Sequence, residues 1–133
     1  MGTELEMVLR LLLAAALGAI IGYQRERAGK QAGLRTHILI CIGAALFTIA
    51  SIYGFGAAGD AARVAAGVVV GIGFLGAGAI IRGGEGIVAG LTTAATIWAV
   101  AGIGLAAGAG LYLVSAVTTA LVLIVLFLPH RIR

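Results

Sequence analysis

Charged residues, proline and cysteine are all scarce in this chain. Only 11% of its 133 residues are charged and 62% are hydrophobic, whereas about 25% of the residues in a typical soluble domain are charged. The nine Lys or Arg and five Asp or Glu residues are too few to cover a water-soluble globule of this size and keep it dispersed. The shortage of charge therefore argues against an ordinary water-soluble fold.

The single cysteine and the scattered histidines limit the chemistry of the chain. Cys41 lies inside an apolar run, so one chain supplies neither a disulfide framework nor a thiolate metal cluster, and we expect a buried structural thiol. His37 and His130 lie far apart, and no acid lies near the middle of an apolar run. We therefore predict no catalytic residues, no metal site and no cofactor, and we do not expect an enzyme.

Long stretches without charge define the fold class. Residues 38–59, 64–81 and 86–129 contain no Lys, Arg, Asp or Glu over 22, 18 and 44 positions, and a membrane span needs about 20 residues. The longest stretch is predicted to turn within the glycine-rich segment 102–110. Since a bilayer supplies no water to backbone groups and the runs lack alternation, they are predicted to be helices. The prediction is an all-α, polytopic helical membrane protein with five transmembrane helices at about 7–23, 37–56, 62–81, 87–105 and 110–128.

The start and end of the chain add two expectations. The first residues are acidic where a signal peptide would be basic, so we expect the first apolar run to be retained. Arg10 lies near the end of that run, where a long side chain reaches the headgroups. Residues 1–133 are interpreted as a single integral-membrane domain without a carboxyl-terminal soluble domain.

The distribution of basic residues predicts the orientation. Seven Lys or Arg residues lie on one side of the predicted spans and two on the other. Because positive charge is retained in the cytoplasm, the amino terminus is predicted outside and the carboxyl terminus in the cytoplasm. The basic residues behind the formal net charge of +4 thus lie mainly at the ends of the predicted spans and in the loops between them. We therefore expect no nucleic-acid partner. The seven are Arg25, Arg27, Lys30, Arg35, Arg82, Arg131 and Arg133, and the two are Arg10 and Arg63.

Glycine spacing predicts how the helices pack. Pairs four residues apart let helix backbones approach closely in lipid; they are Gly18/Gly22, Gly67/Gly71, Gly86/Gly90 and Gly104/Gly108. The third span is densest in glycine. It is either a tightly packed central helix or a helix that bends or breaks, as in transporters. Its glycines, assigned to helix packing, are Gly67, Gly71, Gly73, Gly76 and Gly78.

The polar segment 22–37 is the first candidate site. It is either a basic juxtamembrane loop that meets anionic lipid headgroups or a defined cytoplasmic cluster in which Glu26 bridges arginines. The spacing of Glu26 and Lys30 suits a helical ion pair, and Thr36 is positioned to cap the second span. The candidate residues are Arg25, Glu26, Arg27, Lys30, Arg35, Thr36 and His37, with Arg82 facing them from the next inner loop.

The second candidate site is the polar segment 90–98. Thr92, Thr93 and Thr96 lie on about one helical face, and the indole of Trp98 is deep enough to need a hydrogen-bond partner. These four residues either serve structural packing or form an intramembrane polar wall shared with Arg82.

The polar segments and the glycines between them form three ordered blocks. They read Arg25-Glu-Arg27 with Gly29-Lys-Gln-Ala-Gly-Leu-Arg-Thr-His37, then Gly73-Phe-Leu-Gly-Ala-Gly-Ala-Ile-Ile-Arg82, then Gly90-Leu-Thr-Thr-Ala-Ala-Thr-Ile-Trp98. In order and spacing they resemble the MgtC/SapB family over nearly the whole chain. The sequence departs from many relatives at Gln24, where they have an acid. Longer members also continue into a soluble domain beyond the part matched here.

The resemblance implies a multi-pass protein of the bacterial inner membrane that is linked to growth at low magnesium and, in pathogens, to survival inside macrophages. Its best-known members act as modulators, including inhibition of the proton-driven ATP synthase. We therefore expect a modulator of magnesium and ion homeostasis acting through membrane partners or lipids, including anionic ones. The alternative is a small ion transporter or channel with the third span lining the route. A homo-oligomer, with a dimer favoured, is also expected.

Overall fold

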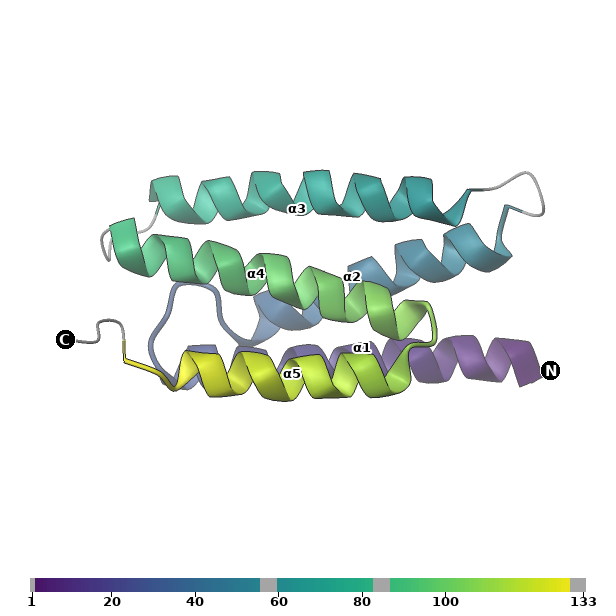
Figure 1. Cartoon of the computed structure of the whole chain (residues 1–133), viewed down its shortest axis with the longest axis horizontal. Coiled ribbons are helices and arrows are strands. Elements are labelled where there is room, and N and C mark those ends of the chain that lie inside the picture. Colours follow the sequence, from purple (N-terminus) through teal and green to yellow (C-terminus); the bar gives the residue numbers. More distant parts are fainter. Residues whose placement is uncertain (1, 56–59, 83–86, 130–133) are drawn as a thin grey trace.

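The described part of the chain is entirely helical. The computed structural model describes residues 2–55, 60–82 and 87–129, and within them lie five α-helices and no strand (Figure 1). The prediction of an all-α fold with five helices is confirmed. The helices are α1 (Gly2–Arg27), α2 (Leu34–Tyr53), α3 (Ala61–Arg82), α4 (Ile87–Gly108) and α5 (Tyr112–Leu126).

Four of the helices are long and apolar enough to cross a membrane, and the fifth is shorter. The 15 residues of α5 extend over about 22 Å, less than the roughly 30 Å of a bilayer core. The predicted fifth span, 110–128, is therefore too long at both ends. The turn before it falls at 109–110, inside the predicted segment 102–110, whereas the fourth helix ends at Gly108, three residues later than predicted. The length of an apolar run predicts which residues lie in the membrane, but it does not predict the residue at which the helix ends.

The helices run alternately up and down, so the two ends of the described chain lie at opposite ends of the bundle (Figure 1). Helix α4 is central and contacts each of the other four helices. Helices α1, α2 and α4 supply the main core, where Cys41 is fully buried as predicted. The core residues are Ala14, Leu17, Ile21, Cys41, Ala45, Val100, Ile103 and Ala107.

Helix α2 is held between glycines of α1 and α4. A Cβ atom added at Gly18 would lie 2.7 Å from the backbone oxygen of His37, and one at Gly108 would lie 2.6 Å from that of Ala45. Real Cβ atoms do not approach backbone oxygens so closely, so only glycine fits at these contacts. The small-residue packing predicted for Gly18/Gly22 and Gly104/Gly108 is confirmed, since Gly22 and Gly104 also meet the backbone of α2.

For the third span, the alternative of a helix that bends or breaks is wrong. The packing predicted for its glycines is seen at Gly76 and stays a prediction at the other four. Helix α3 is continuous from Ala61 to Arg82, so it neither bends out of helical geometry nor breaks. It also lies at the edge of the bundle, packed on α4 and α2 (Figure 1). Gly76 touches Ala94 of α4, but Cβ atoms added at the other four glycines would meet nothing within 4 Å in the described part. Those four are Gly67, Gly71, Gly73 and Gly78. Glycine spacing predicts that another helix can approach the glycine-bearing face of a helix closely. It does not predict whether a neighbouring helix lies on that face.

The alanine variant of Gly108 tests the packing of α4 on α2. We expect Gly108→Ala to lower the free energy of unfolding by about 1–3 kcal/mol, the usual cost of overpacking, as measured by denaturant titration of the purified protein in mild detergent. Gly102→Ala is the matched control on the same helix, because a Cβ there meets nothing within 4 Å and alanine favours helix. Equal losses for the two variants would contradict this packing.

Candidate functional site

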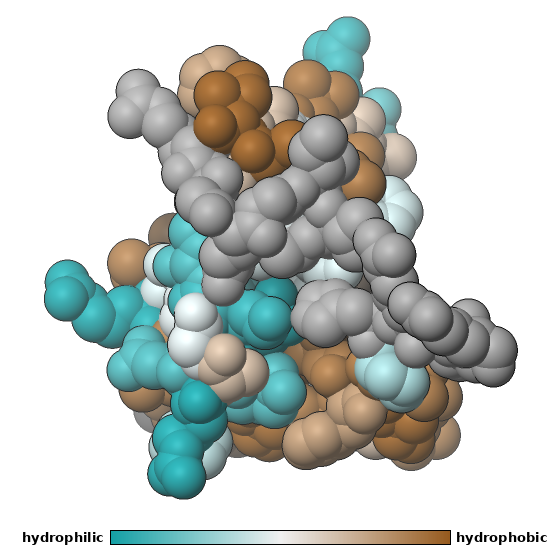
Figure 2. Space-filling view, turned by 90° about the vertical axis from the view of Figure 1, so that its left-hand side faces the viewer, coloured by the Kyte–Doolittle hydropathy of each residue, from teal (hydrophilic) through white to brown (hydrophobic). Residues whose placement is uncertain are grey.

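The basic end of the bundle begins where α1 turns into α2. Figure 2 looks onto this end and shows hydrophilic residues gathered on it. The N–H of Lys30 donates to the oxygen of Arg25, and the N–H of Gly29 donates to that of Glu26, both at 3.0 Å. Gly29 has a φ of 71°, so this is a glycine-dependent helix end that satisfies carbonyls of the last turn. The sharp reversal brings the end of α1 beside the start of α2.

Glu26 stabilises the start of α2. Its Oε1 atom accepts the backbone N–H of Leu34 at 3.0 Å, and a carboxylate at a helix N-terminus is favoured by the helix dipole. The structure contradicts the prediction that Thr36 caps this helix. Because α2 already begins at Leu34 after Gly33, Thr36 lies inside the first turn, and its side chain is exposed.

Arg25 points into the bundle and links α1 to α4. Its side chain is only 3% exposed, and Nη2 donates to the Oγ1 atom of Thr93 at 3.1 Å. Thr93 is fully buried. Sequence reasoning placed these two residues in separate candidate sites, and the structure joins them through one buried hydrogen bond.

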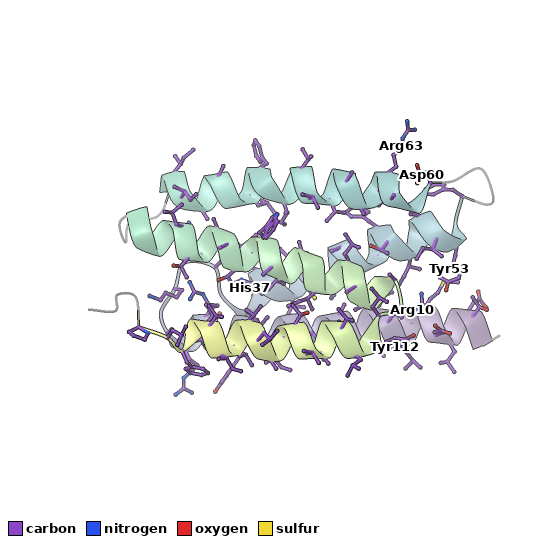
Figure 3. All side chains as sticks on the ribbon, in the orientation of Figure 1. Arg10, His37, Tyr53, Asp60, Arg63 and Tyr112 are labelled. Atoms are coloured by element: carbon purple, nitrogen blue, oxygen red, sulfur yellow. The ribbon has the colours of Figure 1, made fainter. Side chains whose placement is uncertain are left out.

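His37 is fully buried near the start of α2 (Figure 3). Its Nδ1 lies 2.8 Å from the oxygen of Gly33, and because a carbonyl only accepts, Nδ1 carries the proton of that hydrogen bond. The Nε2 atom of His37 and the Oε1 atom of Gln24 are buried without a hydrogen-bond partner in the described part of the chain. This end of the bundle therefore holds polar atoms inside as well as on its surface.

The remaining candidates of the first segment do not join Arg25 in the interior. Arg27 and Arg35 are exposed and Lys30 is half-buried. The Nη1 atom of Arg27 donates to the hydroxyl of Tyr23 on the outside of α1 at 3.0 Å. Arg82 ends α3, and its side chain lies outside the described part, so its predicted approach to the cluster stays a prediction. The segment is thus divided into an inward group and an outward one.

The second candidate segment is divided in a similar way. Thr93 and Thr96 are buried on α4, and the hydroxyl of Thr96 donates to the backbone oxygen of Thr92 at 2.8 Å, within its own helix. Trp98, which was expected to complete a polar wall, is 59% exposed. Two residues beyond Thr96 the helix has turned by about 200°, so Trp98 faces away from the buried threonines.

A second polar cluster at the opposite end was missed from the sequence (Figure 3). Arg10 is only 7% exposed and forms an ion pair with Glu6. Its Nη1 donates to the oxygen of Gly108 at 3.0 Å, and its Nε to the hydroxyl of Tyr112 at 3.1 Å. The guanidinium also lies 5.5 Å from the ring centroid of Tyr53. Arg10 therefore ties α1 to α2, α4 and α5.

The expectation that Arg10 reaches the headgroups stays a prediction, and the structure shows its guanidinium held by protein groups. The turn between α4 and α5 forms around its guanidinium, since a Cβ added at Gly110 would lie 2.9 Å from Nη2, and Gly110 has a φ of 86°. Glu6, four residues before Arg10, was the one local signal of an ion pair. The other partners, Tyr53, Gly108 and Tyr112, lie on other helices or at their ends, where sequence spacing gives no signal.

The chemistry that these residues offer is hydrogen-bond donation to anions. Arginine presents planar donors that match phosphate and carboxylate, and in the described residues no group of three or more His, Cys, Asp or Glu side chains is placed to hold a metal ion. Helix lengths, composition and packing together define a multi-pass helical membrane protein with a basic, partly buried polar end.

The chain belongs to the MgtC family, whose sequence profile matches residues 11–133. It is 46% identical to YhiD of Escherichia coli (strain K12), named as a candidate magnesium transporter, over 96% of this chain and 62% of YhiD. It is 38% identical to SapB of Bacillus subtilis (strain 168) over 96% of this chain and 59% of SapB.

A third relative is MgtC of Salmonella typhimurium (strain LT2), which is 48% identical over 77% of this chain and 43% of that protein. The chain thus spans less than two thirds of the length of these three relatives. No solved structure matches it. The family and the long apolar helices together make this chain a multi-pass membrane protein of the MgtC family.

The hydrogen bond between Arg25 and Thr93 is tested by removing its acceptor. We expect Thr93→Val to lower the free energy of unfolding by about 1–3 kcal/mol, because a buried donor loses its partner. Thr96→Val is the matched control, since that buried hydroxyl bonds only to its own helix, and its loss is expected to be smaller. Thermal unfolding in detergent measures both variants. A larger loss for Thr96→Val would overturn this assignment.

The contribution of Arg10 to stability is tested by comparing its alanine variant with that of Arg27, a second arginine that stacks on a tyrosine. We expect Arg10→Ala to cost about 1–3 kcal/mol of unfolding free energy, because the buried carbonyl of Gly108 loses its donor. Arg27→Ala removes an exposed arginine stacked on Tyr23, and surface contacts of this kind contribute about 0–1 kcal/mol. Denaturant titration compares the two. An Arg10→Ala protein as stable as Arg27→Ala would refute the tie between helices.

Proposed function

We propose that this protein modulates magnesium homeostasis in the bacterial inner membrane by contacting membrane partners or lipids, and does not carry ions through its own bundle. The observation that supports the proposal is the apolar core between the two polar ends. On α1 this core occupies positions between Arg10 and Arg25, and on α4 positions between Thr93 and Gly108. Its eight members, listed above, are at most 6% exposed. The buried threonines nearby, Thr48, Thr96 and Thr119, donate their hydroxyls to backbone oxygens of their own helices. An ion that left water for this cluster would meet no charged side chain among its eight members to replace its hydration.

The alternative is a small transporter or channel, which the name of YhiD favours. In that hypothesis α3 lines the route. Two glycines of α3, Gly67 and Gly71, line a groove of about 530 Å³ between α2 and α3. The other walls of the groove are apolar, with Leu39, Phe47 and Val64 among them. An apolar groove suits lipid chains or another helix better than a hydrated ion. A family partner such as ATP synthase, or a second copy of this chain, fits the same modulating role.

Ion flux separates the two functions directly. We expect the purified chain, reconstituted in liposomes that contain a magnesium indicator, to give no magnesium flux above empty liposomes. A protein of known magnesium flux, reconstituted in parallel, serves as the positive control. Flux that rises with the amount of protein would contradict the proposal.

Growth at low magnesium tests the modulating role in cells. In a strain that lacks its own copy, we expect the chain to restore growth and Arg35→Ala to lose most of that effect at unchanged protein level, because Arg35 is exposed at the basic end. Arg63→Ala removes an exposed arginine at the opposite end and is expected to grow as the original chain does. Equal growth of the two variants would contradict a role for the basic end.

A further inference from the structure

A cavity of about 270 Å³ opens at the basic end, between the end of α1, the start of α4 and the end of α5. Its polar wall consists of Gln24, Arg25, Lys30 and Thr92, and its apolar wall includes Val125 and Leu128. Three helices that are distant in the sequence thus bring two cations, a hydroxyl and an amide to one hollow. The Arg25–Thr93 hydrogen bond and the reversal at Gly29 form part of its frame.

The charge of the cavity is suited to an anion. Two basic side chains line it, and the described lining residues include no carboxylate. Glu26 is adjacent in sequence to Arg25 but does not line the cavity, and its Oε1 accepts the N–H of Leu34 at the start of α2. Because Arg25 is almost fully buried and bonded to Thr93, its guanidinium is already oriented. A guanidinium fixed in this way loses little freedom when it binds phosphate oxygens.

The apolar wall indicates where the anion comes from. Val125 and Leu128 are 60% and 56% exposed, so the cavity opens beside a surface that suits acyl chains. Its volume is slightly below the roughly 300–1,000 Å³ of pockets that enclose whole small ligands, which suits a headgroup whose tails remain in the bilayer. Basic pockets between transmembrane helices on the cytoplasmic side bind anionic headgroups in this way.

We propose that the cavity formed by Gln24, Arg25, Lys30 and Thr92 binds the phosphate headgroup of an anionic phospholipid. This site deepens the proposed function, on which it rests, by naming its lipid partner. Lipid binding to the purified protein is measured without any magnesium phenotype. A failure of this inference is therefore distinguishable from a failure of the proposed function.

Lipid titration of the full chain tests the site. Short-chain phosphatidylglycerol or phosphatidylcholine is added to the protein in neutral detergent, and bound lipid is counted by native mass spectrometry. We expect preferential binding of phosphatidylglycerol and an affinity about fivefold lower in Lys30→Gln, the effect of one basic residue near a membrane surface. Lys30→Arg should restore the affinity. Arg27→Gln is the matched control: it removes an exposed charge of the same segment that does not line the cavity.

Three results would overturn the inference. Equal binding of the two lipids would remove the anionic preference, and equal losses in Lys30→Gln and Arg27→Gln would indicate general surface attraction in place of a cavity. Inorganic phosphate that displaces phosphatidylglycerol at concentrations comparable to those of the lipid would make the ligand a free anion. Selective loss in Lys30→Gln without such displacement supports the lipid site.

Discussion

Close contact between the backbone of α2 and the glycines of α1 and α4 is the constraint on which the rest of the bundle depends. Because lipid tails are as apolar as the helices, there is little hydrophobic driving force for the helices to associate. Stable packing therefore needs helix backbones that approach each other closely. Gly18 and Gly22 provide this on one side of α2, and Gly104 and Gly108 on the other. The resulting three-helix core leaves α3 on the edge, with most of its own glycines uncovered.

This core also determines what the polar residues can do. It separates a basic end around Arg25 from the cluster around Arg10, and each arginine secures one end of the bundle by bonding across helices. Arg10 takes up a carbonyl at the end of α4, where the helix dipole favours a cation. Arg25 instead stands at the wall of an open cavity. The arginine of one end is therefore enclosed by protein groups, whereas the arginine of the other end lines the cavity proposed above as a lipid site.

Features that depend on local sequence were predictable. The number of helices, the burial of Cys41 and the packing of Gly18 and Gly104 follow from apolar runs and spacing. The hydrogen bonds of Arg10 to Gly108 and of Arg25 to Thr93 were not predictable, because each partner lies on a helix about 70 to 100 positions away. The glycines of α3 show the same limit: their spacing predicts a face that another helix can approach closely, but in the described bundle only Gly76 meets a neighbour.

A tryptophan scan tests most directly whether α2 is enclosed while α3 lies at the edge. Folded yield is measured by fluorescence-detected size exclusion for Ala45→Trp, at a fully buried position of α2, and for Leu39→Trp and Val70→Trp, at exposed positions of α2 and α3. The account predicts loss of the folded peak for Ala45→Trp alone. Tolerance of Ala45→Trp together with loss for Val70→Trp would contradict it.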